Sequence, residues 1–493
     1  MASPIEEPCF SPTESPPCEE HGQLLFEPEE PYELNPPERL STPGLLLLTC
    51  PSLGLQVCWF LLQSSGTPYL HSLGMTSSSI SLAWALGPIF GAFVQPIIGQ
   101  LSDELHHPLG RRKPAIIAGA LITIIFALIM ACASELTTPF TKTQAANPWQ
   151  PRALAVACLV VILLALTAYS VGVRAIVVDA CPPSQQPAAA AWSMRWNVLG
   201  SAVLSTAGFV STTQPPGTDP VVAFRTLVCV AAICSAATVG LVCWFVPRDA
   251  TPPLRHFGSG IGRVCAMCLP GELARRWGRL PPLTGRVCSV QFVAWFGWFP
   301  VLYYMSTYAY ETALFELLET PSLEVSSPEA SAKPYPLYAS LSISIGTLLS
   351  TLVLTLLSQT SAILRTRNLP RLWLLSQLLA TTSLLLTIPF QASTASLTLI
   401  SLIGVTQAVT MWVPFALVNT ELAELRTGVA GVQGLHNMAI SLPQVVSALI
   451  CAVVLAGLDL LGVERDAVWL LRLAAAPFAW SAWLIWRLDG AVA

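Results

Sequence analysis

The sequence predicts an all-α membrane protein with twelve transmembrane helices, arranged as two six-helix halves that repeat one pattern. Three observations support this: the composition, the spacing of the apolar stretches and the positions of the basic residues. Of the 493 residues, 53% are hydrophobic and 11% are charged, and the mean hydropathy is +0.62. Soluble domains carry about 25% charged residues. Most of this chain must therefore face lipid or the inside of a helix bundle.

Twelve apolar stretches have about the 20 residues that a membrane-spanning helix needs. They lie at residues 44–65, 78–101, 114–134, 153–178, 195–213, 222–246, 287–310, 336–358, 369–390, 395–419, 429–456 and 467–487. An Arg-rich break separates the first six from the last six. We therefore expect four parts, namely a tail at 1–40, an N-terminal half at 41–247, a basic cytoplasmic loop at 248–285 and a C-terminal half at 286–493.

The predicted tail is rich in Pro and Glu and carries Arg39 as its one basic residue, so we expect it to be disordered. It has no basic segment followed by an apolar core, which argues against a cleavable signal peptide. Elsewhere, Lys and Arg gather in alternate loops, which predicts that both termini are cytoplasmic. The loops predicted to be cytoplasmic hold Arg111–Lys113, Arg195, the Arg-rich break, Arg365, Arg367, Arg371 and Arg426.

A faint internal match supports a duplication of the six-helix unit. Residues 174–197 align with residues 415–437 with one gap, and both segments end in an Asn. In each segment an apolar stretch reaches an acid, a turn follows, and an Ala- or Gly-rich helix begins. The match falls at the fourth-to-fifth and tenth-to-eleventh spans, where a transporter built from two related halves predicts it.

Two apolar helices joined by a short charged turn occupy residues 84–119. Small or polar residues spaced four apart share one face of the first helix and allow another helix to approach closely: Gly87, Gly91, Gln95, Gly99 and Asp103. The turn then runs through Gly110, Arg111, Arg112 and Lys113. This layout resembles the signature loop of major facilitator transporters, which implies a gating role for Asp103, Gly110, Arg111 and Arg112. The alternative is a plain helix hairpin with solvated charges.

Ionisable side chains inside a span are costly and are functional candidates by default. Arg174 follows some twenty apolar residues, and its planar fork of donors suits hydroxyl or carboxylate groups of a substrate. Asp179 follows five residues later and is the candidate for exchanging the coupled proton. The alternative is that Arg174 marks the end of the span and pairs with Asp179.

Further polar and aromatic residues extend the candidate substrate site. Gln56 and Gln63 lie two helical turns apart in the first span, close to Tyr69, and amides that donate and accept suit a sugar. Trp295 in the seventh span could stack on a pyranose ring. Asn437, with His436 beside it, begins the polar part of the eleventh span and faces either the cavity or the cytoplasm. Interhelical hydrogen bonding and interfacial aromatic belts are the alternatives.

Enzyme and metal motifs are lacking. We find no nucleophile elbow, Walker A loop, H-E-x-x-H or basic nucleic-acid patch, so we expect a protein that is not an enzyme and binds no cofactor, metal or nucleic acid. Most of the 14 cysteines stand in apolar runs, and the lone C-x-x-C at Cys265 and Cys268 is weak support for zinc. Active transport would then depend on an ion gradient.

Motifs in both halves resemble the sucrose–proton symporters, a group of glycoside–cation symporters with the major facilitator fold. They are G-L-Q-V-C-W-F-L-L-Q-S-S-G-T-P-Y-L-H-S-L-G from Gly54, L-G-P-I-F-G-A-F-V-Q-P-I-I-G from Leu86, G-R-R-K-P from Gly110, R-A-I-V-V-D from Arg174, W-F-G-W-F-P from Trp295, V-P-F-A-L from Val413 and H-N-M-A-I-S-L-P-Q from His436. The resemblance implies symport of sucrose, or a related α-glucoside such as maltose, with a proton by alternating access. It also implies that Arg174 contacts sugar, and that the protein is a monomer in the plasma membrane or a vacuolar or other organellar membrane.

The chain departs from the plant pattern at two places that bear on its chemistry. Ser77 stands where plant members have a substrate-site His, and Met305, Ser306 and Thr307 replace the acidic D-T-D of the seventh span. These departures favour the fungal and animal branch. They keep two alternatives open: a sugar facilitator or exporter without proton coupling, on the plasma or an organellar membrane, and a non-transporting sugar sensor.

Overall fold

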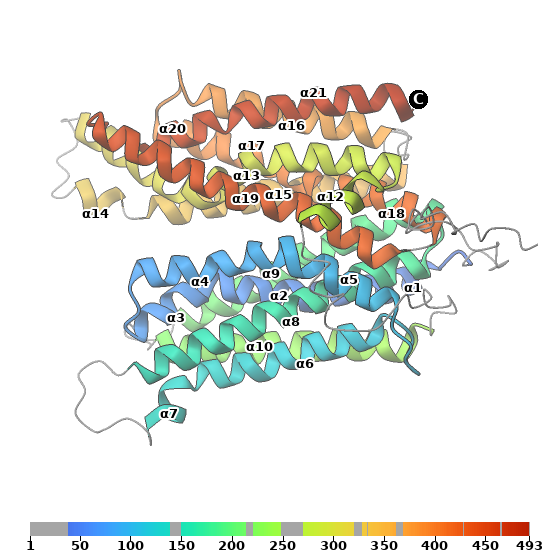
Figure 1. The fold of residues 1–493 in the computed structure, drawn as a ribbon. Helices are drawn as coiled ribbons and strands as arrows, with labels where there is room; N and C mark the ends of the chain where they lie inside the picture. The colour runs from blue at the N-terminus through green and yellow to red at the C-terminus, as the bar shows by residue number, and fades with distance from the viewer. Residues whose placement is uncertain are drawn as a thin grey trace, which may run out of the picture.

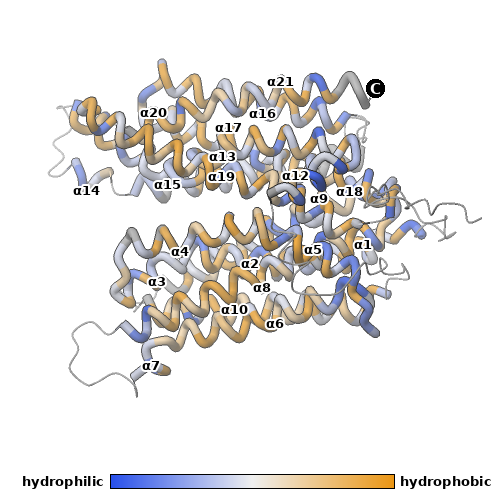
Figure 2. The backbone as a smooth tube through the Cα atoms, in the orientation of Figure 1, coloured by the Kyte–Doolittle hydropathy of each residue, from blue (hydrophilic) through white to orange (hydrophobic). Residues whose placement is uncertain are grey.

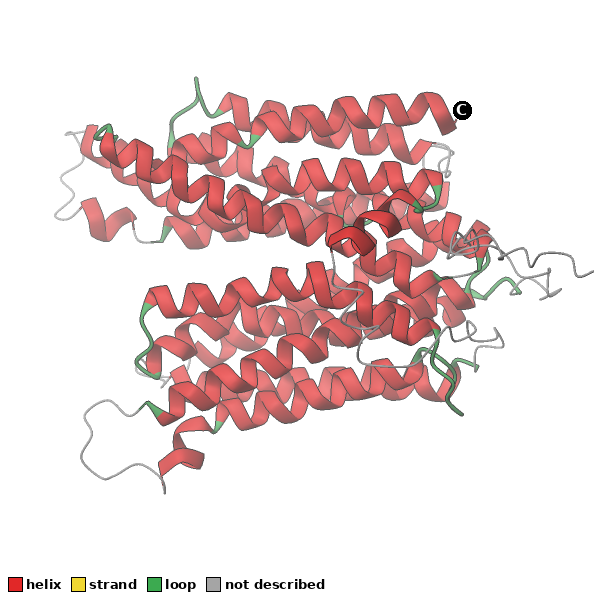
Figure 3. Ribbon diagram, in the orientation of Figure 1, coloured by secondary structure: helices red, strands yellow, loops and turns green. Residues whose placement is uncertain are grey.

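The computed structural model describes residues 38–138, 149–212, 220–247, 270–319, 328–332, 334–360, 368–426, 428–463 and 466–492. Throughout these ranges the chain forms helices joined by short loops, with no strand (Figure 3). Nearly all of the predicted acidic tail, Cys265, Cys268 and the basic loop up to residue 269 lie outside the described residues.

The first half is a bundle built from the predicted spans (Figure 1). Its first segment is a series of short helices, α1 (Thr42–Thr49), α2 (Pro51–Leu61), η1 (Leu62–Gly66) and α3 (Thr67–Ser72), and its second consists of α4 (Ser77–Ile89), η2 (Phe90–Val94) and α5 (Gln95–Asp103). The remaining long helices are α6 (Lys113–Ala131), α8 (Gln150–Ala180), α9 (Gln186–Thr212) and α10 (Pro220–Phe245). Two short elements, α7 (Ala133–Thr137) and η4 (Pro183–Gln185), join them.

The second half forms the other bundle in Figure 1. Its helices are α13 (Pro282–Glu319), α15 (Tyr335–Thr360), α16 (Leu369–Leu386), α17 (Ser393–Thr410), α18 (Val413–Leu425), α19 (Val429–Leu460), α20 (Asp466–Leu473) and α21 (Ala475–Val492). Before them comes α12 (Pro270–Gly278), a helix inside the predicted basic loop, and α14 (Pro328–Ala332) precedes α15. The predicted division at residues 247 and 286 stays a prediction, because most of the intervening segment is not described.

Ten segments in the described ranges are long and apolar enough to cross a membrane. α17 and α18 count as one of them, Ser393–Leu425. The other two predicted spans correspond to α9 and to α15, whose apolar part Tyr338–Leu354 is shorter. The sequence placed Arg195 in a loop before the fifth span, but α9 starts nine residues earlier, so Arg195 lies inside the helix with its guanidinium 4.3 Å from the ring centre of Trp192.

Hydrophobic residues follow the helices along their length (Figure 2). Each half has its own apolar core, and a further cluster joins residues of α8 and α9 to residues of α18 and α19. Large apolar side chains also point outward, for example Trp244 at 84% and Leu460 at 88% exposure. Such an outward surface suits lipid contact, since soluble proteins rarely expose wide apolar patches.

One end of the bundles, here called the basic end, brings the charged turns together. There α5 and α8 finish, α6 begins at Lys113, and α19 begins at Val429 close to the end of α18 (Figure 1). The opposite end holds α3, α7, α14 and α20. Across the two halves α5 packs along α19, and α9 packs along α18. This contact positions the candidate site.

Candidate functional site

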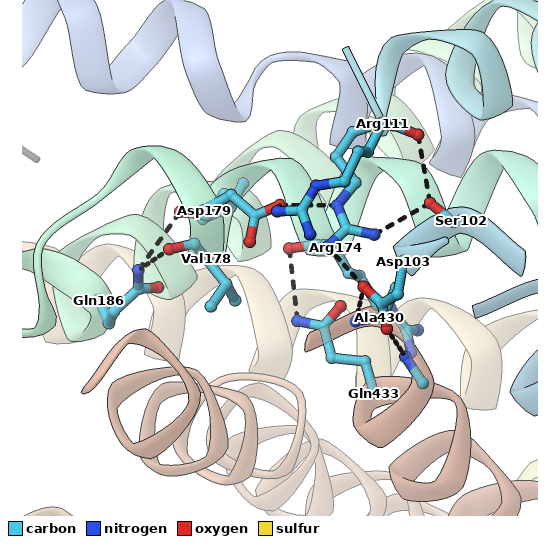
Figure 4. Close-up of polar contacts among 12 residues, drawn as sticks. Ser102, Asp103, Arg111, Arg174, Val178, Asp179, Gln186, Ala430 and Gln433 are labelled. Carbon is cyan, nitrogen blue, oxygen red and sulfur yellow. Dashed lines mark hydrogen bonds and ion pairs between the residues drawn. The ribbon is translucent and has the colours of Figure 1, made fainter. Parts of the chain in front are cut away.

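A buried cluster of ion pairs occupies the N-terminal half at the basic end (Figure 4). Arg112 donates from its Nη2 to Asp103 Oδ1 at 2.7 Å and from its Nε to Asp179 Oδ2 at 2.6 Å. Arg111 Nη2 lies 3.4 Å from the same oxygen of Asp179, and Ser102 Oγ accepts a bond of 3.0 Å from Arg112. The side chains of the four charged residues are at most 5% exposed. The cluster therefore joins the ends of α5 and α8 to the turn before α6.

Two carboxylates keep the guanidinium of Arg112 charged in the cluster. Burial alone would lower the pKa of Arg112, but the carboxylates of Asp179 and Asp103 more than offset this and raise its pKa above the ordinary value. Gly110 enables the turn, because its φ of 88° is a left-handed conformation that side chains disfavour. The Gly110 N–H donates to His107 O at 2.9 Å and closes that turn. The turn thus delivers both arginines to the buried acids.

Asp103 also joins the two halves. Its carboxylate accepts hydrogen bonds from the backbone N–H groups of Ala430, at 3.2 Å, and Gly431, at 2.8 Å, in the first turn of α19 (Figure 4). The N-terminus of a helix carries unpaired N–H groups and a partial positive charge, so a carboxylate there is stabilised. The acid that closes the second span therefore caps a helix of the other half.

The glycine-lined face predicted on the second span lies against α19 at two of its three glycines. A Cβ on Gly99 would stand 2.2 Å from Ala430 O, and a Cβ on Gly91 would stand 2.5 Å from Ser441 Oγ. From α19, a Cβ on Gly434 would approach Pro96 Cα to 2.5 Å. Gly87 instead faces α8, at an ordinary distance from Leu163. The close approach predicted from the spacing is confirmed for Gly91 and Gly99.

Arg174 lies on α8 where four helices of the two halves meet. Its Nη1 donates to Asn437 Oδ1 at 3.1 Å, and its Cζ lies 4.8 Å from the ring centre of Phe415 on α18. Asn437 Nδ2 in turn donates to Gly91 O and to Ser441 Oγ, both at 3.1 Å. The Arg174 side chain is partly exposed, whereas Asn437 is buried. Two predicted substrate residues are thus brought into direct contact across the halves.

A second amide supports this contact. Gln433 Nε2 lies 3.4 Å from the backbone O of Arg174 and 3.2 Å from Asn419 Oδ1 (Figure 4). Asp179, although only five residues from Arg174, is held by Arg111 and Arg112. The alternative interpretation of the sequence, in which Arg174 pairs with Asp179, therefore differs from the contacts that these two residues make.

The other predicted substrate residues lie apart from this centre. Gln56 Nε2 donates to Ser201 Oγ on α9 at 3.1 Å, and Gln63 is exposed. Tyr69 is 1% exposed, donates to the carbonyl of Met130 and stacks on a ring of α10. Trp295 is 6% exposed in the core of the C-terminal half, and its Nε1 has no hydrogen-bond partner among the described residues. The structure gives Gln56 and Tyr69 helix-to-helix contacts.

Sequence reasoning did not single out Phe415, Gln433 or Ser441. One feature of the sequence could have indicated Phe415, namely the internal match that aligns it with Arg174. The two side chains are in contact in the structure. Among the described residues, no group of His, Cys, Asp and Glu is arranged to hold a metal ion.

Three comparisons place the chain among known proteins. The model of the Major Facilitator Superfamily matches residues 47–448. The general alpha-glucoside permease of Schizosaccharomyces pombe is 27% identical, over 92% of this chain and 95% of that protein. The sucrose transport protein SUT4 of Oryza sativa subsp. indica is 30% identical over a shorter part, 36% of this chain and 31% of its own length.

Solved structures show the same fold at low identity. FucP in the outward conformation is 16% identical, with a TM-score of 0.58 over 90% of this chain and 98% of that one. The proton:xylose symporter XylE is 13% identical, with a TM-score of 0.57 over 90% and 95%. With the match over residues 47–448, these findings show that the chain belongs to the Major Facilitator Superfamily and is a multi-pass membrane transporter, not an enzyme.

Proposed function

We propose that this transporter carries an α-glucoside such as sucrose or maltose, together with a proton, by alternating access. The observation that carries the proposal is the contact of Arg174 with Asn437 between the halves. A guanidinium and an amide there supply several donors and an acceptor, the set that sugar hydroxyls require. The permease similar over nearly the whole chain supports this substrate class.

The basic end is proposed to be the cytoplasmic end, as the distribution of Lys and Arg predicts. There Asp103 ties α5 to α19, so the structure corresponds to the state closed on that side. Opening requires the Asp103 contacts to the α19 backbone to break, along with the Arg174–Asn437 bond. Sugar that competes for Arg174 would weaken one of these two ties, which would link binding to opening.

Asp179 is proposed to belong to this gate. A proton carrier must gain and lose its proton during every cycle, but protonating Asp179 would give up its contacts with both Arg111 and Arg112. This pairing favours, as a second candidate function, a facilitator without proton coupling. Plasma-membrane location, cytoplasmic termini and a monomeric state remain part of the proposal.

The test is uptake of labelled sucrose and maltose in cells lacking their own transporters, at pH 5 and pH 7, with and without a protonophore. Accumulation that rises at pH 5 and collapses with the protonophore supports symport. Equilibration that is indifferent to pH supports the facilitator. No uptake of either sugar, with protein shown to be at the surface, contradicts glucoside transport.

Variants at Arg174 test the site itself. Arg174→Ala should abolish uptake, and Arg174→Lys should restore little of it, because a lysine keeps the charge but not the planar fork. Arg225→Ala is the matched control, since Arg225 is a partly exposed arginine of α10 whose guanidinium pairs with Glu135 at the other end of the bundle. Uptake by Arg174→Ala equal to that of the control would contradict this site.

A further inference from the structure

His436 is a buried imidazole that the proposed site leaves unused. It lies in the second turn of α19, directly before Asn437, and is 1% exposed. Its Nε2 is buried and has no hydrogen-bond partner among the described residues. A buried polar atom without a partner is costly, so native proteins seldom retain one without a role.

The ring of Phe415 links His436 to Arg174. The His436 ring meets it edge to face, with centroids 4.9 Å apart and an interplanar angle of 69°. The Arg174 guanidinium lies 4.8 Å from the centre of the same ring. The imidazole and the proposed sugar-binding guanidinium therefore both pack against the ring of Phe415.

Other charges on the surrounding helices are engaged elsewhere or lie at helix ends. Asp103 and Asp179 belong to the ion-pair cluster, and Glu421 accepts bonds from Leu283 N and Thr284 N at the start of α13. Within the described ranges, the remaining charged or titratable residues on α19 and the helices packed around it are Arg152, Cys158 and Tyr169 on α8, Glu272, Arg275 and Arg276 on α12, Arg286, Cys288, Tyr303, Tyr304, Tyr308, Tyr310, Glu311, Glu316 and Glu319 on α13, Glu424 on α18, Cys451 and Asp459 on α19, and Asp466 and Arg472 on α20.

Given the proposed symport, on which this step rests, we infer that His436 binds and releases the coupled proton. With its hydrogen on Nδ1, the neutral imidazole has a lone pair on Nε2 that takes a proton from a hydronium ion, forming an N–H bond and leaving water, and later returns that proton to water. Imidazole is the side chain whose charge changes most readily near neutral pH. His436 follows Gly434, which packs against Pro96 of α5, by two residues, so separation of the halves at the basic end would open this part of α19 to water.

Coupling to the sugar follows from charge repulsion. A proton on His436 places a second positive charge across Phe415 from Arg174. This repels the guanidinium from its place on Asn437 and frees it for sugar hydroxyls, so proton and sugar favour each other's binding. Loss of the proton on the cytoplasmic side lets Arg174 return to Asn437 and expels the sugar.

The experiment measures sucrose accumulation and sucrose-induced alkalinisation of the medium for wild type, His436→Gln and His71→Gln. Gln keeps a polar side chain but cannot carry the proton. We expect His436→Gln to exchange sucrose down its gradient yet lose accumulation at least tenfold and lose its pH dependence. His71→Gln, an exposed histidine at the end of α3, should behave as wild type.

Each result decides a different claim. If His436→Gln still accumulates sucrose and alkalinises the medium, the inference fails while symport stands. If wild type carries no glucoside, the proposed function fails, and the inference with it. For a variant that does not reach the membrane, sucrose binding by purified wild-type protein decides instead. Affinity that falls about tenfold between pH 5 and pH 8 supports the inference, and affinity that is flat over this range overturns it.

Discussion

Replacing Asp103 by Asn should open the basic end. The substitution keeps the shape of the side chain but removes the charge that holds Ala430 N and Gly431 N. Hydrogen bonds to a charged group contribute about 1.5–3 kcal/mol each, and a neutral amide oxygen retains roughly one bond of about 1 kcal/mol. The state closed at this end should therefore lose about 2–5 kcal/mol.

That loss corresponds to a shift of about 30- to 4,000-fold in the equilibrium between closed and open states, since about 1.4 kcal/mol is tenfold. The assay uses a reporter, Gln95→Cys, in a background with the native cysteines replaced. Gln95 is 4% exposed on α5 facing α19, so a membrane-impermeant alkylating reagent reaches it only when the halves separate. Alkylation from the basic end should accelerate strongly in the Asp103→Asn variant.

The control is Glu104→Gln, which removes a charge one residue further on. Glu104 Oε1 accepts a bond of 3.0 Å from Gln100 Nε2, on the same half as Asp103. It should leave the alkylation rate near that of the parent. Equal rates in Asp103→Asn and its parent would refute the idea that this carboxylate holds the halves together.

Three further predictions concern other contacts. Gly99→Ala should also favour the open state, because the added Cβ would stand 2.2 Å from Ala430 O, and the same alkylation assay reports it. Gly110→Ala should cost about 1–2 kcal/mol of stability, seen as a lower unfolding temperature, because its φ is 88°. The hydrogen bond from Arg225 lowers the pKa of Glu135, so its stabilisation is present at neutral pH and lost as the pH falls through the lowered value. Glu135→Gln should thus destabilise slightly at pH 7, by less than about 1 kcal/mol for this exposed pair, and progressively less as the pH falls through the lowered pKa of Glu135.

Controls separate these effects from general damage. Gly240→Ala, on a face where a Cβ meets nothing within 4 Å, should leave alkylation unchanged and match wild-type stability or exceed it. An unfolding temperature for Gly110→Ala equal to that of wild type would contradict the strain argument. If the destabilisation caused by Glu135→Gln grows as the pH falls, the direction assigned to the pKa shift of Glu135 is wrong.

The sequence predicted the fold and the approach of the second span to another helix, because both depend on local patterns. Apolar length marks spans, and a four-residue repeat of Gly marks a face on which backbones can meet. The partner of that face was not predictable, since nothing near Gly99 specifies Ala430. The helix capped by Asp103 lies more than 320 residues further along the chain.

The candidate site was predicted in part, for a related reason. Arg174 and Asn437 were both marked as costly or polar residues within spans, and they are in contact. The polar residues that cluster in the first span, in contrast, do not lie at this contact. The Tyr69 hydroxyl donates to a backbone carbonyl, and a sequence cannot distinguish a side chain that bonds a neighbouring helix from one that waits for a ligand.

The π-helical turn η2 sets which way the second span faces at its end. In a regular α-helix, residues four apart drift by about 40° around the axis, so a series from Gly91 to Asp103 would wind away from α19. The wider turn of η2 rotates the chain less for each residue and offsets part of this drift. Deleting one residue from the regular α-helical part of α5 would rotate Asp103 by about 100° relative to Gly91 and aim its carboxylate away from the start of α19. The direction in which Asp103 points thus depends on the number of residues in the helix, whichever residues line it.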